Sequence, residues 1–430
     1  RAIGGNMRRN DPPPMTAPSE MSPLADPATG GQGGHPSAAS RPGPPAEPRP
    51  GPRAERSPEP SLAEIAAGFA LPSPVLSVEP LGNGIVNSTY LVRLGDGSAT
   101  VLQRLNTAVF RQPRLVMGNM QRVTRHIRQR VAAGAELLNG RRWSTPEVVA
   151  CRSGGDPWQE LDGGFWRMLT YLPDSDSLDT VSDAGQAQEI GLALGTFHSL
   201  ISDLPASSLA DTLEGFHITP RYLEQHRQVL AAPRPRPDPA GLGPGEEALQ
   251  WALAFVRERE GGVAVLEQAR EAGRLRPRPI HGDPKVNNVL LERGSGRAFA
   301  LVDLDTVKPG LIHYDIGDCL RSVANPLGEE TADWTAVHFD PQLAAAVLQG
   351  YGSVARSFLS DDDRAFLFEA ARLIAFELGL RFLSDHLAGD VYFRCDSPGH
   401  NLRRALVQLQ LSASIEAQES TIRDAVASMG

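Results

Sequence analysis

Cysteine, lysine and long apolar runs are scarce in this sequence. The 430 residues include only three cysteines, Cys151, Cys319 and Cys395, which are widely spaced and odd in number. Such cysteines predict neither a disulfide framework nor a zinc site. No apolar run reaches the roughly 18 residues that a transmembrane helix needs, and the N-terminal residues lack the apolar core of a signal peptide. We therefore expect a cytoplasmic protein with no membrane partner.

Lysine is rare even among the basic residues. Lysine and arginine together number 42, yet the lysines are only Lys285 and Lys308. Because almost all other basic residues of the chain are arginine, the lysine at position 285 indicates a function there. The alternative is that the two lysines lie close together by chance. The net charge of −9 disfavours nucleic acid as a partner, because both the chain and the phosphate backbone are negative.

Residues 1–60 differ in composition from the rest of the chain. They are rich in proline, glycine, alanine, serine and arginine and contain almost no large apolar side chains. Such a segment cannot bury enough apolar surface to offset the entropy that ordering removes. We therefore expect residues 1–60 to be a disordered tail.

Two apolar runs between residues 280 and 306 predict strands, and the polar residues around them follow the pattern of a phosphoryl-transfer site. Asp283 and Asn288 lie five residues apart before the first run, which is the spacing of the catalytic aspartate and the metal-binding asparagine in protein kinases. Lys285 follows that aspartate by two residues, and Asp303 lies at the end of the second run. The combined pattern predicts a kinase-like catalytic loop.

The residue types at these positions indicate distinct roles. We expect Asp283 to orient the acceptor and, as catalytic base, to take its hydroxyl proton, and Lys285 to neutralise phosphate charge. Asn288 and Asp303 carry the oxygen ligands that Mg²⁺ prefers, so they predict a metal site. The plainer alternatives are a loop-capping aspartate and a turn asparagine. Asp305 either adds to the metal site or bonds nearby backbone.

Two further residues are expected to support this loop rather than to take part in the chemistry. His281 precedes the catalytic aspartate by two residues and would brace the loop through hydrogen bonds to the backbone. Asp315 lies at an expected helix start and would hold the same loop in place. Lys308 receives no role.

A glycine-containing turn lies between two predicted strands, at 75–81 and 88–94. Gly82 and Gly84 would let the backbone approach nucleotide phosphates closely, with amide groups facing the anion. Asn87 stands where the kinase loop has its third glycine. An ordinary hairpin turn is the alternative, but the turn precedes the catalytic loop in the order that a kinase requires.

The third predicted strand, at 100–105, should carry the phosphate-pairing lysine of kinases, but it has Gln103 instead. A further strand is predicted at 165–172, and Leu172 at its end would lie in the hinge whose backbone contacts adenine. The expected ATP-binding residues are therefore Gly82, Gly84, Asn87, Gln103 and Leu172.

The order of the predicted elements favours an α+β, bilobal protein-kinase-like fold. Residues 61–173 would form a small N-lobe with an antiparallel sheet for the nucleotide, and residues 174–430 a larger, mainly helical C-lobe for catalysis and substrate binding. The N-lobe would also contain a helix at 113–139 and a strand at 147–150. In the C-lobe, apolar periodicity predicts helices at 183–203, 219–231, 246–272, 341–357, 361–388 and 399–428.

With these motifs in place, the chain resembles the aminoglycoside phosphotransferase/choline kinase superfamily and, more narrowly, the N-acetylhexosamine 1-kinases. The similarity extends from about residue 62 onward. It is carried by residues 84–90, 102–106, 283–288, 302–306, 314–318, 380–383, 389–393 and 400–402. The last two blocks favour the hexosamine subgroup, which also has glutamine at the position of Gln103.

The resemblance implies ATP and Mg²⁺ as cofactors and phosphorylation of the anomeric hydroxyl of an N-acetylhexosamine or related sugar. It also implies that Arg381 and Tyr392 contact the sugar, whereas the residues alone suggest a buried salt bridge and a core position. Two positions depart from the subgroup: Ile85 stands where a histidine often faces the sugar, and Gly282 where asparagine is common. An aminoglycoside or other small alcohol, choline- or homoserine-like, is the alternative acceptor, and a nucleotide-binding pseudokinase is a further alternative.

Overall fold

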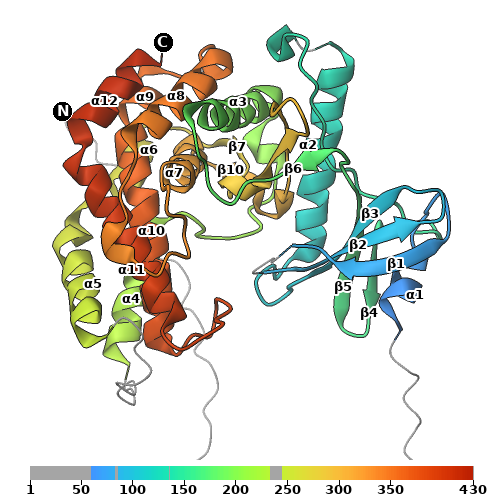
Figure 1. The fold of residues 1–430 in the computed structure, drawn as a ribbon, viewed down its shortest axis with the longest axis horizontal. Coiled ribbons are helices and arrows are strands. Elements are labelled where there is room, and N and C mark those ends of the chain that lie inside the picture. The colour runs from blue at the N-terminus through green and yellow to red at the C-terminus, as the bar shows by residue number, and fades with distance from the viewer. Residues whose placement is uncertain (1–59, 83–85, 135, 233–244, 430) are drawn as a thin grey trace, which may run out of the picture. The chain divides into compact units, whose positions relative to one another are not determined.

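The computed structural model describes residues 60–82, 86–134, 136–232 and 245–429 (Figure 1). The predicted disordered tail lies outside these residues except for Pro60, and so do Gly84 and Ile85. Within the described residues, no helix combines the length and the apolar character that crossing a membrane requires. The described chain is a mixed α+β structure with a five-stranded antiparallel sheet, two smaller sheets and many helices, which confirms the predicted fold class.

The antiparallel sheet has five strands in the order β1-β2-β3-β5-β4. Turn chemistry explains its second hairpin, because Gly97 at φ +85° permits the tight reversal and the Asp96 carboxylate accepts the Ser98 N–H at 3.0 Å. Alternate residues of the inner strands, such as Val92 and Leu102, are fully buried. The strands are β1 (Val75–Pro80), β2 (Ser88–Leu94), β3 (Ala99–Leu105), β4 (Trp158–Leu161) and β5 (Gly164–Thr170).

The sheet confirms the predicted strands except one, and it adds one that was not predicted. The predicted strand at 147–150 is wrong, because only Val148 forms an isolated bridge there, with Leu169. The segment makes only two backbone hydrogen bonds to β5, through Glu147 and Val149, which is too few for a strand. The edge strand β4 was missed.

Two helices accompany the sheet. The capped helix α1 (Leu62–Ala67) begins at Ser61, whose hydroxyl accepts the Glu64 N–H while the Glu64 carboxylate bonds the Ser61 N–H. Helix α2 (Pro113–Ala132) starts with proline, which fits a first helical position, and buries one apolar face. It ends seven residues before the predicted boundary at 139, and Gly134 at φ +74° follows.

Apart from the helix at 312–323, of which only the start was expected, the remaining helices are close to the predicted ranges, but three of the predicted helices are each two helices. The break between α5 and α6 contains Gly261 and Gly262, whose backbone freedom disfavours a continuous helix. The other breaks are at Phe366 and Gln418, where φ is −103° and −115°. The helices are α3 (Ala184–Ile201), α4 (Thr219–Ala231), α5 (Glu246–Arg259), α6 (Val265–Glu271), α7 (Ile312–Val323), α8 (Pro341–Ala355), α9 (Asp361–Ala365), α10 (Leu367–Ala388), α11 (His400–Ala417) and α12 (Glu419–Ser428).

Two small sheets among these helices position the segment that carries the predicted catalytic residues. In one of them β7 (Arg278–Ile280) pairs with β10 (Lys308–Gly310), so that Ile280 lies opposite Lys308. In the other, β8 (Val289–Glu292) lies between β9 (Ala298–Leu301) and β6 (Ser175–Asp176). The strand pairing therefore brings the chain before Asp283 and the chain after Asp305 side by side. The predicted boundaries at residues 61, 173 and 430 remain predictions.

Candidate active site

Asp315, in the first turn of helix α7, anchors the loop that carries Asp283. Its carboxylate is fully buried and accepts hydrogen bonds from the backbone N–H groups of His281 and Gly282, at 2.6 and 2.8 Å, and from His198 Nε2 at 2.8 Å. Burial alone would raise the pKa of Asp315, but the hydrogen bond and charge of His198 outweigh it and lower the pKa. Asp315 thus holds the loop as an ionised acceptor, as expected from the sequence.

His281 braces the same loop from within. Its buried ring donates through Nε2 to the Val302 carbonyl at 3.0 Å, and its own carbonyl accepts the Thr306 hydroxyl at 2.8 Å. Burial lowers the pKa of His281, which keeps the ring neutral. These contacts tie the Asp283 loop to the segment around Asp303, so the structural role expected for His281 is present.

Gly282 has a backbone conformation that favours glycine. Its φ is +91°, and a Cβ at this position would lie 2.6 Å from the Thr306 carbonyl oxygen. Positive φ is accessible to glycine and, less easily, to asparagine. Glycine is therefore required by the turn before Asp283 and by the close approach of Thr306.

A second buried brace was not predicted from the sequence. His217 Nε2 lies 2.8 Å from the Gly282 carbonyl oxygen, and its Nδ1 lies 3.0 Å from a carboxylate oxygen of Glu377. Both partners only accept hydrogen bonds, so the ring must carry both protons. Burial disfavours the charged ring, but the Glu377 carboxylate outweighs this effect and raises the pKa of His217. An imidazolium therefore supports the backbone next to Asp283.

The structure brings the three predicted residues of the catalytic loop together. Lys285 Nζ lies 3.2 Å from Asp283 Oδ2, and the neighbouring Asp283 carboxylate is the main reason that the pKa of Lys285 is raised. Asn288 Nδ2 donates to the Asp283 carbonyl oxygen at 2.7 Å and approaches its Oδ2 at 3.3 Å. Because the amide nitrogen faces Asp283, the Asn288 Oδ1 atom is directed away from it and stays available as a ligand.

Asp303 lies close to this loop, although not at the end of a strand as expected. Strand β9 ends at Leu301, and Asp303 has a left-handed conformation (φ 63°, ψ 57°) before a single 3₁₀ turn, Leu304–Thr306. The Val302 N–H donates to the Asn288 carbonyl at 2.9 Å, which joins the two predicted metal ligands through the backbone. The Asp303 side chain is exposed, but desolvation by the protein around it, followed by the charges of Asp305 and Asp283, raises its pKa to about 7.

Among the described residues, Asp305 pairs with side chains and makes no hydrogen bond to backbone, so the backbone alternative is wrong, whereas a part in the metal site stays a prediction. Arg167 Nη2 lies 2.5 Å from Asp305 Oδ1, and Asn87 Nδ2 donates to Oδ2 at 2.6 Å. Arg167, on β5, was missed from the sequence. A signal was present, because an arginine inside the apolar run Phe165–Leu169 demands a buried partner.

The predicted ATP-binding residues are placed in different ways. Gly82 is exposed, and its φ of +69° suits a tight turn. Leu172 follows β5, and its carbonyl oxygen accepts a hydrogen bond from the Ser175 hydroxyl at 2.8 Å. The side chains of Asn87 and Gln103 are both used in hydrogen bonds around Arg167 and Asp305. Contact of these residues with a nucleotide remains a prediction.

Arg381, on helix α10, lies among aromatic rings rather than carboxylates. Its guanidinium carbon is 5.3, 4.9 and 5.4 Å from the ring centroids of Phe216, Tyr222 and Phe393. Among the described residues it makes no ion pair or hydrogen bond, so a buried salt bridge does not explain it. Burial opposes its charge, but Tyr222, Glu377 and other groups outweigh this and raise the pKa of Arg381.

Tyr392 lies in the loop after α10 and is not a core residue, because 52% of it is exposed. Asp385 shapes this loop, since its carboxylate accepts the backbone N–H groups of Val391, Tyr392 and Phe393 at 2.8–3.0 Å. Asn401 donates to the same carboxylate at 2.9 Å. The Tyr392 and Asp283 side chains are both among the groups that raise the pKa of Arg381, so the three lie in one electrostatic neighbourhood.

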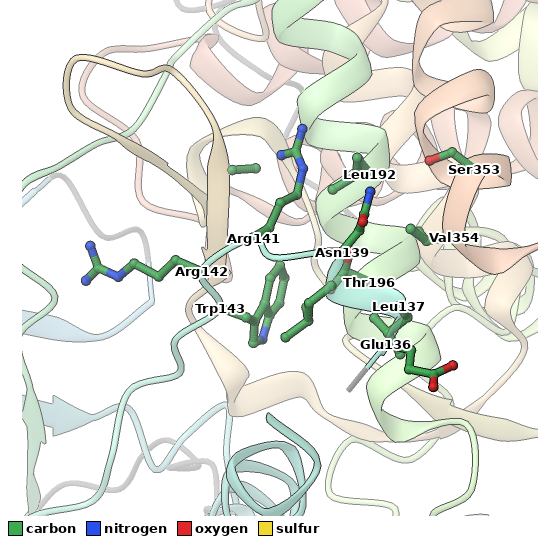
Figure 2. Close-up of a pocket in the computed structure, with 12 residues that line it drawn as sticks. Glu136, Leu137, Asn139, Arg141, Arg142, Trp143, Leu192, Thr196, Ser353 and Val354 are labelled. Atoms are coloured by element: carbon green, nitrogen blue, oxygen red, sulfur yellow. The ribbon is translucent and has the colours of Figure 1, made fainter. Parts of the chain in front are cut away.

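A separate pocket of about 400 Å³ lies between the turn that precedes Trp143 and helices α3 and α8 (Figure 2). Arg141 and Trp143 line it, together with Leu192 of α3 and Val354 of α8. None of the predicted site residues is among its lining residues. The catalytic loop is therefore distinct from this cavity.

Comparison with known proteins identifies relatives of the whole fold. The family described as phosphotransferase enzyme family (APH) matches residues 77–365. A homoserine kinase from Gluconobacter oxydans (strain 621H) is 26% identical over 301 residues, which are 68% of this chain and 77% of that protein.

Solved structures give the same picture of the fold. An aminoglycoside phosphotransferase from Alicyclobacillus acidocaldarius superposes with a TM-score of 0.53 at 17% identity, covering 88% of this chain and 99% of that one. A microcompartment-associated aminopropanol kinase has a TM-score of 0.50 at 16% identity, covering 84% and 97%. At such identities the likeness shows the fold alone, and it supports the kinase-like architecture.

Proposed function

The chain belongs to the phosphotransferase enzyme family, and from this premise we propose that it transfers the γ-phosphoryl group of ATP to the anomeric hydroxyl of an N-acetylhexosamine or related sugar. One observation carries the proposal: Asp283, Lys285 and Asn288 converge within one braced loop, with Lys285 and Asn288 both within 3.3 Å of Asp283 Oδ2. Direct transfer needs positioned groups and charge neutralisation rather than a covalent intermediate. The loop supplies both.

The donor atoms near Asp283 fit a magnesium–nucleotide complex. Among the described residues nothing donates to the Asn288 amide oxygen, and Asp303 is a solvent-accessible carboxylate whose raised pKa reflects desolvation and the nearby negative charges of Asp305 and Asp283. Mg²⁺ characteristically takes one or two protein oxygens and completes its shell with phosphates and water. When bound, it would neutralise the charge that develops on the phosphates. The chain's own part is to hold Asn288 and Asp303 next to each other through the Val302–Asn288 backbone bond.

Asp283 is suited to receive the acceptor's proton. Its side chain is 27% exposed, so a small molecule can reach it, while Lys285 and Asn288 fix its orientation. We propose that Asp283 orients the acceptor hydroxyl and takes its proton as transfer proceeds. Lys285, held in its charged form by Asp283, lies next to the same carboxylate to neutralise phosphate oxygens.

Arg381 and Tyr392 support a neutral or anionic acceptor. The Arg381 guanidinium already lies over the aromatic rings that a quaternary ammonium group would need, and its positive charge would repel that group. Its N–H donors are not used by other described residues, which leaves them for the oxygens of a sugar or an acetamido group. The exposed Tyr392 ring would add a stacking face for the sugar.

A homoserine-like hydroxy acid is the second candidate acceptor. The relative that is 26% identical is named a homoserine kinase, and an arginine without a protein partner is the side chain that best receives a carboxylate, through two parallel hydrogen bonds. Arg381 therefore accommodates this candidate as well as the sugar. A choline-like acceptor has no such support, because its cation would face Arg381.

An ATP-consumption screen tests the proposal. It should compare N-acetylhexosamines, neutral hexoses, homoserine, aminoglycosides and choline, with the phosphate position read by NMR. Activity on an N-acetylhexosamine with a 1-phosphate product is expected. A 6-phosphate product, or turnover of homoserine alone, would refute the anomeric-kinase proposal, and no turnover of any acceptor would favour a pseudokinase.

The catalytic base is tested by Asp283→Asn. We expect kcat to fall by about 10²–10⁴-fold, the usual contribution of a positioned base, with an unchanged melting temperature because the residue is partly exposed. Asp179→Asn, at an exposed position before α3, is the matched control and should leave kcat unchanged. Wild-type turnover in Asp283→Asn would remove the proposed base.

A further inference from the structure

Arg167 is a buried cation to which the proposed chemistry assigns no role. It lies in the middle of β5, its exposed fraction is 0%, and it forms the 2.5 Å ion pair with Asp305. Its Nε and Nη2 atoms also donate to Gln103 Oε1, at 2.9 and 2.7 Å. Burying an arginine is costly unless its partners are well placed. The arrangement therefore calls for a reason beyond packing.

Arg167 ends a row of polar side chains that crosses three strands. Thr89 lies opposite Gln103, and Gln103 lies opposite Arg167, so the three occupy directly paired positions on β2, β3 and β5. Gln103 Nε2 donates to the Thr89 hydroxyl at 3.1 Å. Directly opposed residues share one face of a sheet. The row therefore leads from β2, next to the glycine-containing turn, to Asp305.

Asn87 holds the other oxygen of Asp305. Its Nδ2 donates to Asp305 Oδ2 at 2.6 Å, and its Oδ1 accepts the Asn106 N–H at 2.9 Å. Asp305 is only 2% exposed, and its Oδ1 has the Arg167 ion pair but no aligned hydrogen-bond donor. One carboxylate is thus held from two places in the sheet, from Asn87 just before β2 and from Arg167 on β5.

Helix α2 does not supply the counter-ion that a kinase helix would. In protein kinases the strand lysine pairs with a glutamate of the neighbouring helix. Here Arg167 Nη1 faces the sulfur atoms of Met117 and Met120 of α2, at 3.9 and 3.8 Å. The charge of Arg167 is therefore directed to Asp305, two residues after Asp303.

We propose that Arg167 is a positioning residue that locks Asp303 to the sheet through Asp305. The lock consists of Arg167, Asp305, Gln103 and Asn87, and it fixes the left-handed turn at Asp303 relative to the start of β2. Arg167 ties the sheet to the segment around Asp303 without contacting the reactants, and in this it differs from the phosphate-pairing strand lysine of protein kinases. The proposal rests on the proposed function, because it assumes that Asp303 receives a magnesium–nucleotide complex.

The test measures binding of Mg·AMP-PNP by calorimetry, together with kcat, the KM for the acceptor and the melting temperature. The variants are Arg167→Met, Asp305→Asn and the double variant, which leaves no unpaired charge. Arg141→Met is the matched control, because Arg141 forms two 2.7 Å hydrogen bonds to Glu189 and lines the separate pocket of Figure 2. The control should lose stability and keep both kcat and the Kd.

Each single variant should raise the Kd of Mg·AMP-PNP about tenfold, as coupled neighbouring groups do, and lower kcat about 100-fold through misplacement of the site. The KM for the acceptor should not change. The double variant should regain the melting temperature of the wild type, because no charge is left buried without a partner. It should not regain the wild-type Kd or kcat, because the lock is still missing. Recovery of the Kd in the double variant, or a Kd within about twofold of wild type in the single variants, would overturn the proposal.

Two further outcomes separate the lock from the proposed function. If Arg167→Met does not fold, Arg167→Lys replaces it, since lysine keeps the charge but not the forked contact to Gln103 and Asp305; the same rise in Kd is expected, and a wild-type Kd refutes the lock. Wild-type protein that binds Mg·AMP-PNP but phosphorylates no acceptor would refute the proposed function, while the calorimetry would still decide on the lock.

Discussion

Replacing Asp315 by asparagine should both destabilise the fold and slow the reaction, although Asp315 touches no reactant. Its two oxygens receive three hydrogen bonds, from the His281 and Gly282 N–H groups and from His198. Asparagine has nearly the same shape but only one accepting atom. If that atom replaces Oδ2, the new NH₂ group faces the Gly282 N–H, and two donors then oppose each other in a fully buried position.

The size of the effect follows from those contacts. A hydrogen bond to a charged group contributes about 1.5–3 kcal/mol, and a buried donor without an acceptor costs about 1–3 kcal/mol. The loss of one bond, the weakening of two others and one stranded donor together give about 3–5 kcal/mol, the range for breaking a buried charged contact. With an unfolding entropy of about 2 cal/mol/K per residue, this lowers the melting temperature by about 5 °C for a fold of this size.

The assay combines thermal unfolding across pH with steady-state kinetics. Because the pKa of Asp315 is lowered in the fold, its contribution is present above the unfolded pKa of about 3.9 and is lost as pH falls through the folded value. The difference between wild type and Asp315→Asn should therefore shrink in acid. At neutral pH kcat should fall about 100-fold through displacement of the loop.

The control and the refuting result are equally definite. Asp179→Asn, at an exposed position, should change stability by less than about 0.5 kcal/mol. If Asp315→Asn has the stability of this control and the kcat of the wild type, the buried carboxylate does not hold the catalytic loop.

Two further outcomes follow from the same loop. Gly282→Ala should lower the free energy of unfolding by more than the roughly 1–3 kcal/mol of backbone strain, because its Cβ would also meet Thr306. Gly82→Ala is the control: a Cβ there meets nothing within 4 Å among the described residues, so denaturant titrations should show the strain alone. His217→Gln should cost about 3 kcal/mol at pH 6 by leaving Glu377 buried without a cation. Since the pKa of His217 is raised in the fold, its contribution is complete below the unfolded value of about 6.5 and declines as pH rises towards the folded value. A wild-type-to-variant gap that is constant from about pH 6 to pH 9 would contradict the charged form of His217.

The catalytic loop could be predicted from the sequence because its groups are close in the chain. Asp283, Lys285 and Asn288 lie within six consecutive residues, so their proximity needs no knowledge of the fold. The kinase-like order of strands and helices was accessible for a similar reason, since apolar periodicity is a local property. Breaks such as the one at Phe366 were not accessible, because the apolar pattern continues across them.

The supporting contacts could not be predicted, because they join distant segments. Arg167 and Asp305 are 138 positions apart (305 − 167), and His217 meets Glu377 across 160 positions. No local pattern specifies such pairs, which form only when the sheets and helices have assembled. The partner of Asp305 was missed for this reason: its acidic side chain beside Asp303 indicated metal or backbone, and nothing nearby in the sequence pointed to a remote arginine.

The carboxylate of Asp385 has a consequence for how such an enzyme can be altered. The shape of residues 391–393 depends on backbone N–H groups bonded to Asp385, not on the side chains at those positions. Val391 and Tyr392, which are 78% and 52% exposed, can therefore be exchanged for other residues without dismantling the loop. Under the proposed contact of Tyr392 with the acceptor, a combinatorial library at these two positions, with Asp385 kept, would explore new acceptors while leaving the phosphoryl-transfer machinery untouched.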